Sequence, residues 1–155
     1  MKNFVVKCHL REKLLQSLLK KGKKKVAEKV FLKTLILLET NFPNSSSQEI
    51  LTQAFRNIQP SFEFKKARVH GLSQQIPGAK TVDKQESLAI RWVLDSARTK
   101  QLKKKQLKTK NYGFEHFLSH EICAAFKNES ELVQKKLEVH KLAETNRALA
   151  VQRWW

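Results

Sequence analysis

Three residues of metal-binding types are spaced to fall on one face of a predicted helix. His116, His120 and Cys123 are separated by four and three residues, so a helix over residues 114–126 would present all three to a zinc ion. However, no glutamate follows His116 as in the H-E-x-x-H motif, and the sequence places no fourth ligand nearby. We therefore expect no metal, and predict a packed Cys123 beside outward-facing histidines.

The sequence has no pattern for covalent or phosphoryl-transfer catalysis. Serine, histidine and acidic residues are present, but none forms a G-x-S-x-G nucleophile elbow. Gly22-Lys23 lacks the upstream glycine and the preceding strand of a phosphate-binding P-loop. We therefore expect a protein that is not an enzyme and needs no cofactor.

The strongest chemical signal is positive charge. The 155 residues include 31 Lys and Arg against 14 Asp and Glu, a net charge of +17. Such a charge opposes compaction through self-repulsion, and its usual purpose is to attract a polyanionic partner. Nucleic acid is the first candidate and an anionic membrane surface is the second. No apolar run approaches the ~20 residues of a membrane span, and we expect no membrane partner.

The basic residues form two blocks. Residues 1–33 hold 11 Lys and Arg against two acidic residues, and residues 61–110 hold 13 against four. Residues 34–60 and 111–155 are close to neutral. A disordered basic tail would instead concentrate its charge at one end and lack aliphatic residues. The pattern therefore predicts a folded body with two phosphate-binding surfaces, in preference to a surface charged only for solubility.

Apolar periodicity predicts three helices in the first 60 residues. Leucines between residues 10 and 19 recur at helical spacing, and Gly22 is expected to end this helix. Residues 24–40 are apolar on nearly all sides, which predicts a central helix. A third helix begins with a capping box formed by Ser46 and Glu49.

The next segment, residues 61–82, predicts a basic β-hairpin that turns at His70-Gly71. A lone hairpin is only marginally stable in water, so a nucleic-acid partner is expected to complete it. A fourth helix is predicted after a capping box of Asp83 and Glu86, followed by a Lys-rich linker at about 100–110.

Two further helices complete the prediction. The fifth covers residues 114–126, and the sixth covers residues 130–150 with Asn128 and Glu131 as its capping pair. We therefore predict one domain over residues 1–155, mainly α, with a six-helix body and a β-hairpin that protrudes between the third and fourth helices.

The cysteines and the last residues give weaker signals. Cys8 and Cys123 form no C-x-x-C pattern and nothing suggests secretion, so we expect free thiols in a reducing compartment. Trp154-Trp155 could pack on the core, rest on a neighbouring protein or stack on a base.

Three segments resemble the universal small-subunit ribosomal protein seven family, known in bacteria as S-seven. Residues 140–154, HKLAETNRALAVQRW, resemble the family's H-K-M-A-E-A-N-R-A-F-A-H-Y-R-W. Residues 88–98, LAIRWVLDSAR, resemble L-A-L-R-W-L-V-E-A-A-R, and residues 21–30 resemble G-K-K-x-x-A-x-x-[IV]. The resemblance runs from about residue 14 to residue 154.

The resemblance implies a six-helix body with a hairpin and a structural role in the small ribosomal subunit. It implies binding to the 3′ major domain of the small-subunit rRNA in the head, beside neighbouring head proteins, with mRNA and E-site tRNA nearby. Matched residues and the basic clusters give the rRNA-binding candidates: Lys20, Lys21, Lys23, Lys24, Lys25, Lys65, Lys66, Arg68, Arg91, Arg98, Lys103, Lys104 and Lys105. The candidates near mRNA and E-site tRNA are His70, Gln74, Asn146, Arg147, Arg153 and Trp154.

The hairpin tip departs from the family pattern R-R-V-G-G-A-T-Y-Q-[VI]-P. His70 replaces a glycine and Gln74 replaces an aromatic residue, so the family's turn geometry and ring stacking are not carried over to these two positions. The ending R-W-W and the short N-terminal segment resemble plant and algal mitochondrial members. We therefore expect a mitochondrial ribosome, with a bacterial cytoplasm or a plastid as the alternative.

A helical RNA- or DNA-binding regulator outside the ribosome is the second hypothesis. A basic helix pair can imitate a helix-turn-helix, which inserts a recognition helix with base-reading side chains. The basic residues of this chain fall mainly at helix ends and on the hairpin, which favours phosphate contacts.

Overall fold

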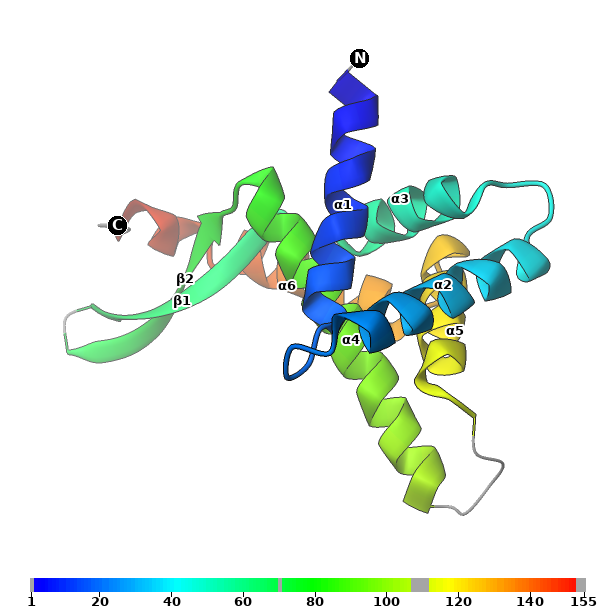
Figure 1. The fold of residues 1–155 in the computed structure, drawn as a ribbon. Coiled ribbons are helices and arrows are strands. Elements are labelled where there is room, and N and C mark those ends of the chain that lie inside the picture. The colour runs from blue at the N-terminus through cyan, green and yellow to red at the C-terminus, as the bar shows by residue number, and fades with distance from the viewer. Residues whose placement is uncertain (1, 70, 107–111, 153–155) are drawn as a thin grey trace.

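The computed structural model describes residues 2–69, 71–106 and 112–152, and it is mainly α-helical (Figure 1). In chain order the elements are α1 (Lys2–Leu18), α2 (Lys24–Asn41), α3 (Ser47–Ile58), β1 (Phe62–Val69), β2 (Leu72–Ala79), α4 (Val82–Gln106), α5 (Phe114–Phe126), α6 (Glu131–Thr145) and the 3-10 helix η1 (Arg147–Gln152). Six α-helices with a hairpin between α3 and α4 confirm the predicted fold class. Within the described ranges, no helix combines the length and the apolarity that crossing a membrane requires.

The hydrophobic core is centred on α5, which packs against α2, α3 and α4. Leu118 and Ile122 of α5 are buried, as are Phe55 and Ile58 of α3. These residues repeat at helical spacing, so each helix directs one apolar stripe into the same interior. The third and fifth helices predicted from the sequence are therefore confirmed.

Helix α2 lies at the edge of the helical bundle, with one side packed against other helices and the other side exposed. Its inner side buries Ala27, Phe31 and Leu38, whereas Leu32 and Ile36 on its outer side are more than half exposed. Neighbours α1, α3 and α5 cover the inner side alone. The prediction of a central helix was wrong, because an apolar sequence does not show which sides of a helix have neighbours.

The predicted start of α3 is confirmed. Ser46 Oγ accepts a hydrogen bond from the Glu49 backbone N–H at 3.3 Å, and the Glu49 carboxylate accepts one from the Ser46 N–H at 3.4 Å. The capping box predicted for α4 is wrong. Asp83 is the second residue of that helix, and both Asp83 and Glu86 bind Lys13 of α1 instead.

Helix α6 also begins differently from the prediction. Ser130 caps it by accepting a hydrogen bond from the Leu132 N–H at 3.2 Å, while Asn128 has a φ of 62° and ends α5. Asparagine tolerates this left-handed conformation better than most residues, which suits the end of a helix. The helix stops at Thr145 and η1 follows, so the predicted single helix to residue 150 was too long.

Helix α4 continues to Gln106, so the predicted linker at 100–110 was wrong for residues 100–106. Lysine, glutamine and leucine are good helix formers and prolong the helix without a buried face. Lys100 also forms an ion pair with the buried carboxylate of Glu121 on α5, which ties this end of α4 to the body. The rest of that segment lies outside the described residues.

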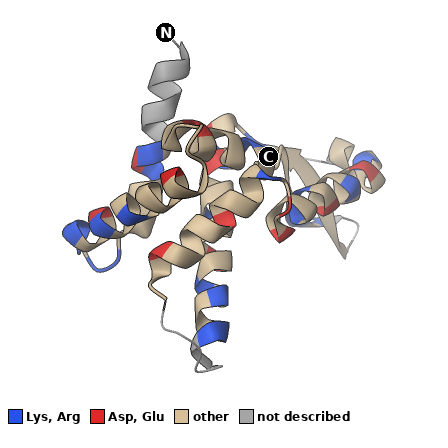
Figure 2. Ribbon diagram, turned by 90° about the vertical axis from the view of Figure 1, so that its right-hand side faces the viewer, with Lys and Arg blue, Asp and Glu red and all other residues tan. Residues whose placement is uncertain are grey.

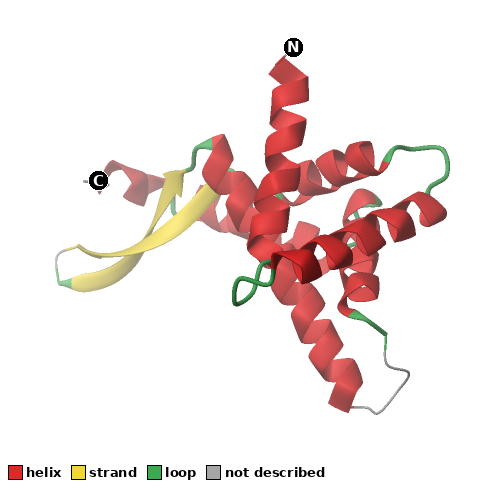
Figure 3. Cartoon of the chain, viewed as in Figure 1, coloured by secondary structure: helices red, strands yellow, loops and turns green. Residues whose placement is uncertain are grey.

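The two strands form an antiparallel hairpin that projects from the helices (Figure 3). Their pairing runs from Phe62 opposite Ala79 to Val69 opposite Leu72, which leaves a two-residue loop. Gly71 in that loop has a φ of 81°, a conformation that tight hairpin turns require and glycine adopts without strain. The hairpin base packs against α6 through β1 and against η1 through β2.

Candidate nucleic-acid interface

The turn between α1 and α2 is a compact basic loop. Lys20, Lys21, Lys23, Lys24 and Lys25 are all exposed around it. Lys21 and Gly22 have φ values of 51° and 71°, and the Lys23 N–H donates to the Lys20 carbonyl at 3.1 Å. Gly22 was predicted to end α1, but it lies in this left-handed turn four residues beyond Leu18. The turn therefore presents its lysines on a short, folded segment.

This turn lies against α4 and forms a small pocket with it. Lys20 and Lys23 from the turn and Arg98 and Gln101 from α4 line this cavity of about 260 Å³, which we call the turn pocket. The remaining lining is apolar and comes from Leu18, Val26, Ala27, Val30 and Phe114. Predicted rRNA-binding residues from two distant parts of the sequence, Lys20 and Lys23 on the turn and Arg98 on α4, are thus brought together.

Arg98 has spare hydrogen-bonding capacity at the turn pocket. Its Nη1 donates to Asp95 Oδ1 at 3.3 Å, while its Nε is buried and has no hydrogen-bond partner within the described part of the chain. A buried donor without a partner is costly, and an anion that accepts from it would remove that cost. A guanidinium beside two lysines is well suited to a phosphate oxygen.

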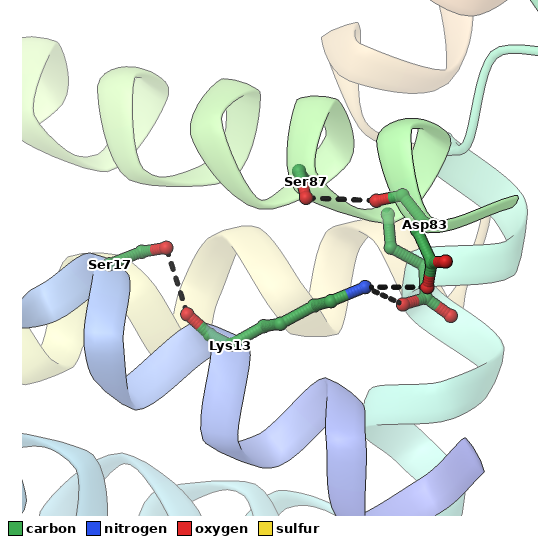
Figure 4. A network of polar contacts seen from close by, with 5 residues as sticks. Lys13, Ser17, Asp83 and Ser87 are labelled. Atoms are coloured by element: carbon green, nitrogen blue, oxygen red, sulfur yellow. Dashed lines mark hydrogen bonds and ion pairs between the residues drawn. The ribbon is translucent and has the colours of Figure 1, made fainter. Parts of the chain in front are cut away.

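An ion-pair network sets the position of α1, and with it the turn. Lys13 Nζ lies 2.9 Å from Glu86 Oε2 and 3.0 Å from Asp83 Oδ1, both at the start of α4 (Figure 4). The Glu86 side chain is only 7% exposed, whereas that of Asp83 is 77% exposed, so the Glu86 pair is the shielded one. Burial of Lys13 opposes its charge, but the hydrogen bonds and charges of Glu86 and Asp83 outweigh burial and raise the pKa of Lys13. Sequence reasoning missed this network, because its partners are more than 65 residues apart.

Along α4, the predicted basic residues occupy more than one side of the helix. Arg91 is exposed, and Arg98 follows seven residues later on nearly the same face. Lys103 and Lys104 are exposed near the end of the helix. The side chain of Lys105 lies outside the described residues. Figure 2 shows Lys and Arg gathered at the α1–α2 turn and along this end of α4.

On the hairpin, the three predicted basic residues divide between two faces. Lys66 and Arg68 share one face of the strand because side chains alternate, while Lys65 lies on the other. All three are exposed. Gln74 lies opposite Ala67, and its shielded Oε1 has no hydrogen-bond partner among the described residues.

A histidine holds the base of the hairpin. His140 Nε2 of α6 accepts a hydrogen bond from the Ser61 N–H at 3.1 Å. The same ring packs edge-on against Phe62, with centroids 5.6 Å apart. His140 belongs to the closing motif that resembled the ribosomal family, but the motif did not indicate this contact.

The closing segment lies beside the hairpin. Asn146 follows α6 as its C-cap, and Arg147 begins η1 with an exposed side chain. Because η1 packs on β2, these two predicted residues belong to the same side of the molecule as the hairpin base. His70, Arg153 and Trp154 lie outside the described residues, as does Trp155.

The candidate metal ligands occupy α5 as predicted. His116 and His120 are exposed and Cys123 is half-buried, with Asn41 Nδ2 at 3.7 Å from its Sγ. Burial raises the pKa of the Cys123 thiol above its ordinary value, which disfavours the thiolate that would bind a metal. In the described portion of the chain, no group of three His, Cys, Asp or Glu residues is arranged to hold a metal.

Known proteins of one family are similar to this chain over most of its length. The family described as Ribosomal protein S7p/S5e matches residues 2–147. The small ribosomal subunit protein uS7 of Blochmanniella floridana is 32% identical over 148 residues, which cover 96% of this chain and 88% of the relative. Proteins of the same name from Thermotoga neapolitana and Thermosipho melanesiensis are 33% and 34% identical over 142 residues, covering 92% of this chain and 85% of each relative. The chain, with its basic turn, hairpin and helical body, therefore belongs to the ribosomal protein S7p/S5e family.

Proposed function

We propose that this protein is a structural constituent of the small ribosomal subunit that binds the 3′ major domain of the small-subunit rRNA. The observation that carries the proposal is the turn pocket, where Lys20, Lys23 and Arg98 converge. Membership of the family and the name shared by its relatives support the same role. No catalytic step is part of this function.

Phosphate contacts are the expected mode of binding at the turn pocket. Lysine and arginine neutralise phosphates and release counterions, so affinity depends on salt and not on base sequence. The Lys13 network fixes the turn against α4 before RNA arrives, which lowers the entropy lost on binding. The turn pocket therefore serves to position the protein on a folded RNA.

The hairpin is the second RNA-facing element of the proposal. Lys66 and Arg68 on one face are exposed, and a projecting strand pair can enter between RNA segments that the body does not reach. We assign the hairpin, Asn146 and Arg147 to the side near mRNA and E-site tRNA. Neighbouring head proteins are the other expected partners.

We also propose a cellular compartment for this protein. The resemblance of the R-W-W segment to plant and algal mitochondrial members supports a mitochondrial ribosome, while the relatives named above are bacterial, and a bacterial cytoplasm or a plastid is the alternative. Fractionation of the source cells, followed by sedimentation, distinguishes these compartments.

Sedimentation of ribosomal subunits is the direct test of the function. A tagged chain should comigrate with the small subunit, and it should remain there after the large subunit is separated at low magnesium. Recovery only in free or DNA-bound fractions would contradict the ribosomal role and favour the regulator hypothesis.

A further inference from the structure

A second cavity lies on the side of α5 that carries His116, His120 and Cys123. This α5 cleft has a volume of about 930 Å³, within the ~300–1,000 Å³ typical of ligand pockets. It extends from the end of α2, at Leu37, Asn41 and Phe42, to the end of α4, at Lys100, Lys103 and Lys104. The three residues that looked like metal ligands are thus part of a larger site.

Aromatic rings line part of the α5 cleft. Tyr112 is 46% exposed, and its ring lies edge-on to His116 with centroids 5.4 Å apart. Phe117 and Phe42 contribute two further rings to the lining. An exposed tyrosine beside other rings offers a flat surface on which a planar base can stack.

The rest of the lining is strongly basic. Lys103, Lys104 and Lys127 surround the rings, and Glu129 is the one acidic residue among the described lining residues. Lys104 Nζ lies 5.4 Å from the centre of the Tyr112 ring and 5.5 Å from that of Phe117. The phosphate of a nucleotide whose base stacks on Tyr112 would therefore lie among the lysines that line the cleft. Lys100 is already paired with Glu121 and contributes less.

We propose that the α5 cleft binds an unpaired nucleotide of RNA, with the base against Tyr112 and the adjoining phosphate on Lys103 and Lys127. The inference rests on the proposed function and adds a recognition mode that the turn pocket lacks. A base within a duplex presents only its edges, so its ring face cannot reach Tyr112. The cleft therefore selects single-stranded or bulged RNA, whereas the turn pocket accepts phosphates of any RNA.

Tyr112 can serve as a spectroscopic probe of the α5 cleft. Tyr112 is the only tyrosine, so 3-fluorotyrosine labelling gives a single ¹⁹F signal from the cleft. Single-stranded hexaadenylate should shift this signal saturably, while a 12-base-pair RNA duplex at equal phosphate concentration should not. Binding of both RNAs is also measured on the unlabelled protein by filter retention.

Two variants separate the roles of ring and charge. Tyr112→Ala should weaken hexaadenylate binding roughly 5-fold or more. Lys103→Gln with Lys127→Gln should weaken it roughly 3- to 10-fold, since two phosphate contacts are lost. The control Lys84→Gln with Lys141→Gln removes two exposed charges outside the cleft lining and should leave hexaadenylate binding nearly unchanged.

The outcomes distinguish this inference from the proposed function. Duplex binding without a ¹⁹F response to hexaadenylate would overturn the cleft assignment and leave the ribosomal role intact. Equal affinities of Tyr112→Ala and wild type for hexaadenylate would do the same. Failure of the wild-type protein to bind either RNA would overturn both.

Discussion

The turn pocket is attached to the body by a shielded ion pair, whereas the hairpin, in the part of the chain that the structure describes, contacts the body through α6 and η1. Lys13 and Glu86 fix α1 and its turn against α4, with the Glu86 carboxylate almost removed from solvent. Near the hairpin base Ile76 is fully buried, but toward the tip Arg68, Leu72 and Ser73 are exposed.

This difference suggests that the two basic surfaces bind RNA in different ways. The turn pocket is arranged before binding, so most of its interaction energy is available for affinity. Toward the tip of the hairpin the described residues Arg68, Leu72 and Ser73 are exposed, and a two-stranded sheet alone is marginally stable. The hairpin is therefore expected to be ordered partly by its partner.

The largest expected effect comes from breaking the attachment of the turn. Lys13→Ala leaves the Glu86 carboxylate shielded and unpaired, which should lower the free energy of unfolding by about 3 kcal/mol. Urea unfolding measures this loss. The double variant Lys13→Met with Glu86→Leu should recover most of it, because an apolar pair needs no charge compensation. A loss below about 1 kcal/mol for Lys13→Ala would show that the network does not fix the turn.

A smaller effect is expected at the hairpin base. His140→Ala removes a hydrogen-bond acceptor and a ring contact, so the free energy of unfolding should fall by about 1 kcal/mol. Amide hydrogen exchange of β1 and β2 should quicken more than that of α5. His140→Phe retains a ring but lacks the acceptor, and should give an intermediate result. Unchanged strand exchange in both variants would rule out His140 as the residue that holds the base.

The smallest expected effect is the loss of folding stability at acidic pH. It arises from Glu115, which lies in the helical body. Burial of Glu115 opposes its charge, but its own backbone N–H and the hydrogen bond and charge of Lys33 outweigh burial and lower the pKa of Glu115. Its contribution is therefore present above the ordinary glutamate pKa and is lost as the pH falls through the lower pKa of the folded state. Because Lys33 is half exposed, the loss should be less than about 1 kcal/mol.

Urea unfolding at pH 6 and near pH 3.5 checks this response. Glu115→Gln should show a smaller decrease between the two conditions than wild type. Glu138→Gln, which changes an exposed residue of α6, is the matched control. An identical decrease in Glu115→Gln and wild type would show that the Lys33 pair does not contribute.

Local patterns in the sequence predicted the elements of the fold well. The period of the apolar residues located α3 and α5, the Ser46–Glu49 pair located the start of α3, and alternation located the hairpin. Each of these signals depends on residues that lie close together in the chain, so it can be recognised in a single sequence.

The sequence did not reveal features that depend on distant partners. Lys13 and Glu86 are 73 residues apart, and Ser61 and His140 are 79 residues apart. The sequence also did not show that Trp92 is only half-buried, with Lys135 Nζ 4.6 Å from the centre of its ring. The lysines after residue 100 looked like a linker because charge alone does not distinguish a solvated helix from a loop.

The most direct test of the turn pocket is a double-mutant cycle on binding to the 3′ major domain of the small-subunit rRNA. Lys23→Gln and Arg98→Gln should each weaken binding and lower its salt dependence, by about one unit or less per phosphate contact. If both residues hold one phosphate, their effects should be non-additive by about 1 kcal/mol, whereas Lys23→Gln and Arg68→Gln, on the two separate surfaces, should add. Full additivity of Lys23 and Arg98, with an unchanged salt dependence in the double variant, would contradict a phosphate site in the turn pocket.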